Sequence, residues 1–328
     1  MPTLTTIPRE LRDNILGYVI QSDTDPRPDI HSTFDDLIQG REILKEPKLG
    51  SWCTTVLYHP ETPIANTYGA LLTNRQLRSE TLENIQRLNA NECNLDVIIV
   101  EEILPLPTWT RVVAPSTRLD KVNVTFRISG RWHSDKERHT EDGVSVDGPY
   151  TKYGYYKGFK IGDGAGPAMS WQVYSILERF IKIGYIGKCG DGFGRRCTTV
   201  KTININVETP PDIDPSEFGF PLSSRHSRRY NPTVLEPKYL ANFIDSNISG
   251  LLCSQDHEWF GYGKILFQNV DVIRISLDGQ LNKEYDVAEC LKNAGGFKAH
   301  YIPTQKLRQY RKETWKERKE RGLKLLEE

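Results

Sequence analysis

The chain has 328 residues, and its 43 Lys and Arg residues are balanced by 43 Asp and Glu residues, so the formal net charge is zero. This balance excludes attraction of the whole surface to nucleic acid or to an acidic membrane, because both need a basic excess. The hydrophobic fraction of 38% and the charged fraction of 26% indicate a folded chain with some polar loops. We therefore expect one large domain or two small ones with a core that is stable on its own.

The sequence carries no signal that would direct the chain into a membrane or out of the cell. No stretch approaches the roughly 20 apolar residues of a membrane helix. The N-terminal residues do not form the charged and apolar pattern of a signal peptide. The six cysteines follow no short regular spacing, which favours reduced thiols. These features predict no membrane partner and an intracellular address, cytoplasmic or nuclear.

The first predicted element is an amphipathic helix that begins near Pro8 and ends before Asp23. Proline is well suited to the first helical position, because the N–H that it lacks would have no partner there. Leu11, Ile15 and Val19 recur at intervals of four residues and form one apolar stripe. Prolines and glycines then break residues 23–66, apart from one helical turn expected at 35–38.

Alternation of apolar and polar residues predicts the strands of the chain. After a second helix at about 69–88, the expected elements are strands at 95–100 and 122–128, a proline-broken apolar loop at 104–110, a third helix at 168–183, a strand at 203–207, a short helix at 239–252, a strand at 265–277 and a charged helix from 305 to the end. These elements do not alternate as βαβ units, so we expect an α+β fold.

The expected architecture is an N-terminal helical motif packed on a mixed or antiparallel sheet with helices. It divides into a helical region at 1–90 with a proline-rich insert, an α+β body at 91–303 and the charged helix at 304–328. Long loops interrupt the body at 131–168 and 209–236.

Sequence motifs for catalysis are absent or incomplete. Neither G-x-S-x-G nor H-E-x-x-H occurs, so we expect a non-catalytic protein without a cofactor. The glycines at 162–166 precede a helix, but they match neither the dinucleotide motif nor the P-loop. An enzyme remains the lesser alternative, with a site near the 150–166 loop or at His257 and Glu258, which adjoin two aromatic residues.

Metal binding is not expected from the cysteine and histidine spacings. Cys189 and Cys197 lie eight residues apart, and Cys253 and His257 lie four apart. Structural zinc sites instead use two closely spaced ligand pairs. Free thiols in the core or in loops are the simpler interpretation.

The C-terminal segment, 304–328, is locally basic, with nine Lys or Arg residues against five Glu residues. A helix of this composition could contact RNA or an acidic partner, but most such helices are solvated and carry ion pairs four residues apart. We do not expect nucleic acid to be a partner.

The opening helix, Ile7-Pro-Arg-Glu-Leu-Arg-Asp-Asn-Ile-Leu16, resembles the beginning of F-box motifs. Further pieces, taken in order along the chain, resemble the F-box-like proteins of filamentous fungi. These pieces are Ala70–Glu80, Leu95–Val97, Leu106–Trp109, Val122–Arg127, Ile176–Val207 and Trp315–Leu323.

The resemblance implies that the helix docks on a Skp1-type adaptor of a cullin ubiquitin ligase, while the rest of the chain holds an unidentified protein substrate. Pro8, Leu11, Ile15 and Leu16 are the implied adaptor contacts. The sequence departs from an F-box after residue 22, where the proline-rich insert begins, and residues 74–78 are a candidate for the displaced final helix. The alternative is a stand-alone interaction domain with no adaptor. Exposure of Leu11 and Ile15 would favour the adaptor, because an apolar row facing solvent is available to a partner.

Overall fold

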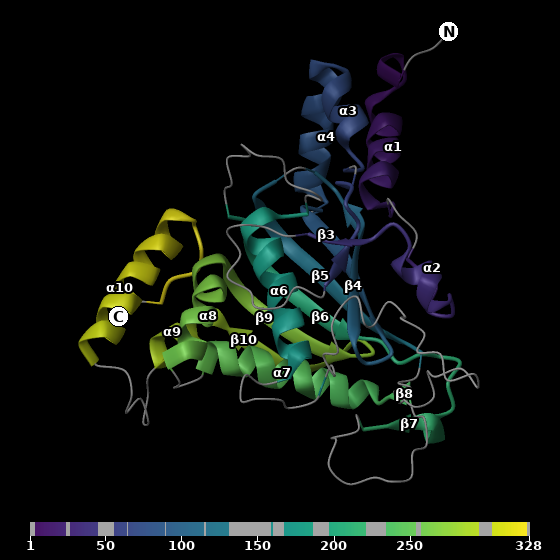
Figure 1. Cartoon of the computed structure of the whole chain (residues 1–328). Helices are drawn as coiled ribbons and strands as arrows, with labels where there is room; N and C mark the ends of the chain where they lie inside the picture. Colours follow the sequence, from purple (N-terminus) through teal and green to yellow (C-terminus); the bar gives the residue numbers. More distant parts are fainter. Residues whose placement is uncertain are drawn as a thin grey trace.

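The computed structural model describes residues 4–23, 27–44, 56–63, 65–88, 90–114, 116–130, 159, 167–185, 197–220, 234–253, 257–294 and 304–326, with the side chains of 253, 257–260 and 304 left out. A twisted sheet forms the centre, with helices stacked against it, a group of helices projecting from one end and a final helix at the outer edge (Figure 1).

The sheet has six strands in the described part of the chain. Their spatial order is β10 (Gln280–Asp286), β9 (Val270–Leu277), β6 (Thr199–Val207), β5 (Arg118–Ser129), β3 (Glu92–Val100) and β4 (Leu104–Val112). The four inner strands run parallel to one another, and the two edge strands are antiparallel to their neighbours. The α+β class is therefore confirmed, and the sheet is mixed.

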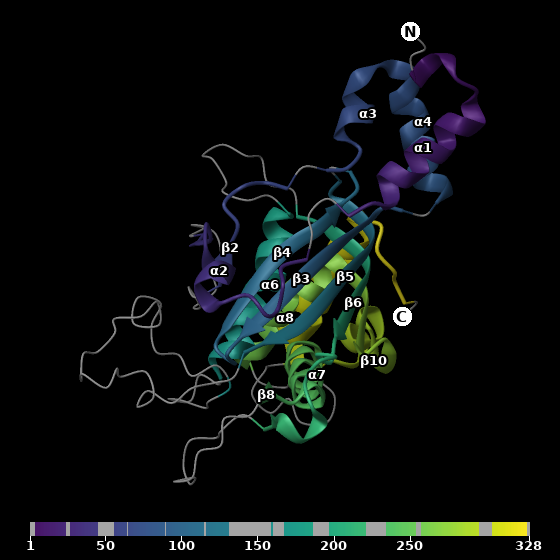
Figure 2. The same ribbon diagram turned by 90° about the vertical axis from the view of Figure 1, so that its right-hand side faces the viewer.

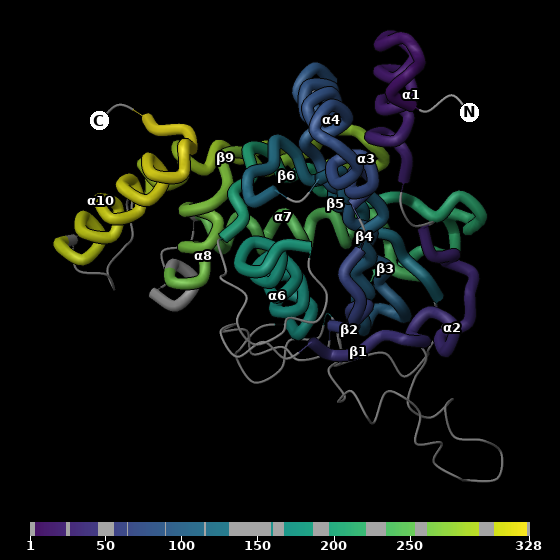
Figure 3. The backbone as a smooth tube through the Cα atoms, turned by 90° about the horizontal axis from the view of Figure 1, so that it is seen from above, coloured from purple at the N-terminus to yellow at the C-terminus, as the bar shows by residue number. Residues whose placement is uncertain are grey.

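Helices cover one face of the sheet. They are α6 (Ala168–Ile183) between β5 and β6, α7 (Pro237–Cys253) and α8 (His257–Asn269) between β6 and β9, and α9 (Val287–Asn293) and α10 (Thr304–Glu320) after β10. Figure 3 shows α6 and α8 on the same side of the sheet. The main core lies between these layers, where apolar residues of the inner strands such as Val97, Phe126 and Ile205 pack against helix residues such as Phe180 and Ile244.

Among the described residues, a short N-terminal layer covers the opposite face over β3 and β4. It comprises α2 (Phe34–Ile38), β1 (Glu42–Ile43) and β2 (Leu57–Tyr58), and it buries a second, smaller apolar cluster. The segment that leads into it crosses the sheet (Figure 2), where Pro28 accepts a 2.7 Å hydrogen bond from Arg127. The remaining short elements are η1 (Leu4–Thr6), η2 (Pro215–Glu217), β7 (Phe218–Gly219) and β8 (Val234–Leu235).

The rest of that second face is polar, although parallel sheets are usually covered on both faces. Asn94, Asn123 and Asn204 stand side by side on β3, β5 and β6. Asn204 donates to Asn123 at 2.9 Å, and Asn123 donates to Asn94 at 3.0 Å. This amide ladder joins three parallel strands through side chains that water can also reach, so the face needs no apolar cover.

The predicted loop at 104–110 is wrong, because these residues form the edge strand β4. Pro105 and Pro107 pair opposite Ile99 and Val97. Proline is tolerated in an edge strand, since one side of that strand has no neighbour to receive an N–H. The prolines therefore protect the edge from further pairing and do not break the strand.

Three other predictions needed correction. The helix expected at 69–88 is divided into α3 (Tyr68–Thr73) and α4 (Arg75–Arg87), because Asn74 is extended and caps α4 by accepting from the N–H of Leu77. The strand expected at 265–277 begins at Val270, after the end of α8. The final helix ends at Glu320, before Gly322 with φ of +69°. The predicted loop at 131–168 lies mostly outside the described residues.

Candidate functional site: the helical lobe

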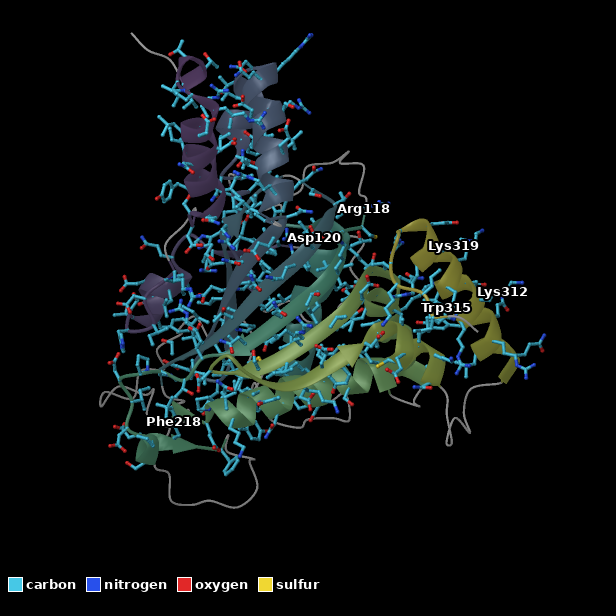
Figure 4. The ribbon with its side chains drawn as sticks, turned by 180° about the vertical axis from the view of Figure 1, so that it is seen from behind. Arg118, Asp120, Phe218, Lys312, Trp315 and Lys319 are labelled. Atoms are coloured by element: carbon cyan, nitrogen blue, oxygen red, sulfur yellow. The ribbon has the colours of Figure 1, made fainter. Side chains whose placement is uncertain are left out.

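Three N-terminal helices form a lobe that projects from the sheet (Figures 1 and 2). They are α1 (Arg9–Gln21), α3 and α4, and we call them the helical lobe. The lobe stands at the end where the parallel strands begin. Arg118 and Asp120, near the start of β5, lie below it in Figure 4. At its base, Ile20 and Ile85 pack with Val113 in a small apolar cluster.

The inward face of α1 is fixed by a buried ion pair and by apolar packing. The guanidinium of Arg12 donates to both carboxylate oxygens of Glu80 on α4, at 2.8 and 2.6 Å. Leu16 and Ile20 are buried on the same side. Asn84 of α4 donates to Asp13 at 2.8 Å. These contacts set the rotation of α1 about its own axis.

The outward face of α1 is an exposed apolar row. Leu11 is 52% exposed, Ile15 is 40% exposed and Tyr18 is 79% exposed. Pro8 is exposed at the start of the row. Spacings of three and four residues place these four side chains on one side of the helix. We call Pro8, Leu11, Ile15 and Tyr18 the apolar row.

The lobe concentrates the exposed apolar side chains of the described chain. Eight large apolar residues are exposed in the described part of the chain, and five of them lie on the lobe helices α1, α3 and α4. The two outside the apolar row are Leu72 on α3 and Leu82 on α4. Single exposed apolar residues are ordinary on protein surfaces, whereas a local concentration of them is typical of an interaction site.

The predicted contact residues therefore divide between the two faces. Leu11, Ile15 and Pro8 face solvent, but Leu16 is only 2% exposed and belongs to the inward packing. Tyr18 joins the outward side, and its spacing of three residues from Ile15 is the sequence signal that could have identified it. The candidate for the displaced final helix, residues 74–78, contains the N-cap Asn74 and the first turn of α4, the helix that packs on α1.

The Arg12–Glu80 pair shifts the pKa of the buried carboxyl. The hydrogen bonds that Arg12 donates lower the pKa of Glu80 to about 2, although burial acts in the opposite direction. Nearby, Arg9 pairs with Glu83, and that contact lowers the pKa of the Glu83 carboxyl. Both carboxylates are already paired within the lobe, and the apolar row is the exposed apolar part of α1.

The lesser alternative, an enzymatic site, falls largely outside the structural description. Residues 150–158 and 160–166 and the side chains of His257 and Glu258 are not described, nor is Cys189. Within the described residues, no group of three or more His, Cys, Asp or Glu side chains is placed to hold a metal ion. A hollow of about 10 Å³ between the sheet and α6 is wholly apolar and has room for about one water molecule.

One buried carboxyl lies at the opposite end of the sheet from the lobe. Glu102, in the turn between β3 and β4, is 9% exposed, and its φ of +61° is in the left-handed region. Burial raises the pKa of Glu102 to about 7. A single shifted carboxyl does not define a reaction, so the lobe is the better-defined candidate site.

None of the helices in the described part of the chain combines the length and the apolar character needed to cross a bilayer. Comparison with known proteins gives no relative: no protein-family model, no curated protein and no solved structure matches the chain.

Proposed function

We propose that the chain is a non-catalytic protein-interaction protein whose helical lobe docks on a Skp1-type adaptor, as a substrate receptor of a cullin ubiquitin ligase. The observation that carries the proposal is the apolar row, which faces solvent on a helix whose other side is fixed by Arg12 and Leu16. The resemblance of residues 7–16 to an F-box opening supplies the identity of the partner. The body of the chain would then hold the protein substrate.

The orientation of α1 supports docking because the row is already exposed on a helix that is held in place. A helix fixed by a buried ion pair loses little further freedom when a partner covers its outer face. Leu11 and Ile15 lie at the middle of the row, where truncation is expected to cost the most affinity.

A binding assay with matched variants tests the proposal. The purified full-length chain is titrated against a recombinant Skp1-type adaptor from a filamentous fungus, and the dissociation constant is measured calorimetrically. The double variant Leu11→Asp with Ile15→Asp should lower affinity at least a hundredfold, because it places two charges in an apolar contact. Circular dichroism should show an unchanged fold, since both residues are exposed.

The control variant is Leu281→Asp, which changes an equally exposed leucine on β10, far from the lobe. It should bind the adaptor as the wild type does. Absence of binding by the wild type would reject the adaptor and favour a stand-alone interaction domain. Equal losses in the control and the double variant would show that the apolar row is not the contact surface.

A further inference from the structure

Apart from Lys306, the cations of the C-terminal helix and of the turn after it fall into two sets with different surroundings. The inward set is Arg311, Arg318 and Arg321. Arg311 donates to the carbonyl of Ala294, and Arg321 donates to the carbonyl of Gln268 at 3.0 Å. These side chains attach α10 and the turn after it to the body of the protein, and their charges are not available to a ligand.

The outward set is Arg308, Lys312, Lys316 and Lys319, which we call the basic row. All four residues are exposed. None of them forms an ion pair with a carboxylate in the described part of the chain. The basic row differs in this respect from arginines of the lobe and sheet such as Arg12, Arg127 and Arg274, each of which forms an ion pair with an Asp or Glu.

The helix spaces the four charges evenly along one side. Intervals of four, four and three residues correspond to about 6, 6 and 4.5 Å along the axis and to an arc of about 80°. Figure 4 labels Lys312 and Lys319 on this helix, and Figures 1 and 3 show α10 at the outer edge of the molecule. Glu313 and Glu320 flank the row, and Glu313 accepts a 2.9 Å hydrogen bond from Gln309.

We propose that the basic row binds the phosphate backbone of a single-stranded nucleic acid. A line of exposed cations matches a strand that carries one negative charge per nucleotide, and phosphate contacts need only charge and hydrogen-bond donors. The zero net charge of the chain does not oppose this, because the contact is local and its four cations pair with no carboxylate among the described residues.

The surroundings of the row disfavour other anionic partners. A protein interface needs a buried apolar or aromatic centre, and the exposed side of α10 offers polar neighbours such as Gln305 and Gln309. A membrane-surface helix needs an apolar face to insert, but the apolar face of α10, with Leu307, is packed against the body. The aromatic residue beside the row, Trp315, is partly buried against the body of the protein, so electrostatic contact with phosphates is the best match to the exposed side of α10.

Fluorescence anisotropy of the full-length chain with a labelled 20-nucleotide single-stranded RNA tests the proposal, with DNA of the same sequence as a second probe. We expect binding at 50 mM salt that weakens steeply as salt is added. Four phosphate contacts predict a slope of about −3 for log affinity against log salt concentration. Replacing all four residues of the row with Gln should lower affinity at least tenfold and bring the slope close to zero.

The control removes the same number of exposed cations from elsewhere in the molecule. It carries Gln at Arg75, Arg118, Lys238 and Lys283, which lie on α4, β5, α7 and β10. Its affinity and salt slope should stay within twofold of the wild type. The proposal is overturned by absence of wild-type binding at 50 mM salt, by an equal loss in the control, or by equal competition from poly-glutamate at the same charge concentration.

Discussion

Arg12 and Glu80 join the two long helices of the lobe through a bidentate ion pair that spans 68 positions of sequence. Both side chains are buried between α1 and α4. Because Arg12 follows Leu11 directly, turning Arg12 inward turns Leu11 toward solvent on a helix that rotates about 100° per residue. The ion pair thus determines which apolar residues of α1 are exposed.

The first prediction is that acid loosens the lobe through this pair. The pKa of Glu80 in the folded protein, about 2, lies below its ordinary value of 4.5. The stabilisation is therefore complete above about pH 4.5 and is lost as the pH falls toward 2. Methyl NMR signals of Leu16 and Ile20, which are buried on the same side of α1 as Arg12, should broaden or shift over this range.

The control for the acid response is Glu80→Gln, which keeps the size of the side chain and removes its charge. This variant leaves Arg12 buried without a charged partner, so the lobe should be loosened already at pH 7. Its methyl signals should then change little between pH 5 and pH 2. An acid response identical to that of the wild type would show that another group controls the lobe.

The second prediction concerns Arg318, which is fully buried beneath α10. Its guanidinium donates to the carbonyls of Phe267 and Val270 at 2.6 and 2.8 Å and to Asp271 at 2.7 Å. Arg318→Met removes these bonds and leaves Asp271 without its charged partner, with only the backbone N–H of Lys324 to donate to it, so the free energy of unfolding should fall by roughly 3–5 kcal/mol. Urea denaturation measures this loss.

The adjacent residue provides a matched control for Arg318. Lys319 is exposed on the same helix, so Lys319→Met should change the free energy of unfolding by less than about 0.5 kcal/mol. If both variants lose the same stability, the buried contacts of Arg318 do not anchor α10.

Elements with a clear periodicity could be predicted from the sequence, and those that depend on pairing could not. The helix at 168–183 and the alternating core of β5 follow directly from their residues. In contrast, β10 (Gln280–Asp286) is polar and almost wholly exposed, and hydrogen bonds to β9 hold it in place. The short apolar run Ile265–Phe267 fits a buried helix and a buried strand equally well, so the sequence alone does not place the start of β9 at Val270.

The candidate site could be predicted only in part for the same reason. A helical stripe containing Leu11, Ile15 and Leu16 is evident in the sequence, but its width does not reveal which residues face the body. That division depends on Arg12 meeting Glu80, a contact between distant segments. The basic row was likewise hidden, because the inward arginines of α10 differ from its outward cations only in their packing.

The third prediction concerns the amide ladder on the open face of the sheet. Asn123 occupies its centre, where it donates to Asn94 and accepts from Asn204. Asn123→Ala removes both hydrogen bonds, so the free energy of unfolding should fall by about 1–2 kcal/mol. Thr125→Ala, a half-buried change on the same face of β5, should cost clearly less. Equal losses in urea denaturation would reject a stabilising role for the ladder.

The fourth prediction is that removing the charge of Glu102 stabilises the protein more and more as the pH rises. Its pKa of about 7 in the folded protein lies above the ordinary value of 4.5. Folding therefore loses stability as the pH rises from about 4.5 to 7, because the buried carboxyl must then carry a charge. Glu102→Gln keeps the shape without the charge, so its advantage over the wild type should grow by about 2–3 kcal/mol between pH 5 and pH 8.

A second substitution at this position separates charge from backbone strain. Glu102 adopts a φ of +61°, which glycine tolerates better than other residues by about 1 kcal/mol. Glu102→Gly should therefore show the same growth of its advantage with pH as Glu102→Gln, displaced by a constant amount. Urea denaturation at pH 5, 6, 7 and 8 measures both effects. A difference between wild type and Glu102→Gln that does not change with pH would mean that Glu102 is already ionised in the folded protein at pH 5.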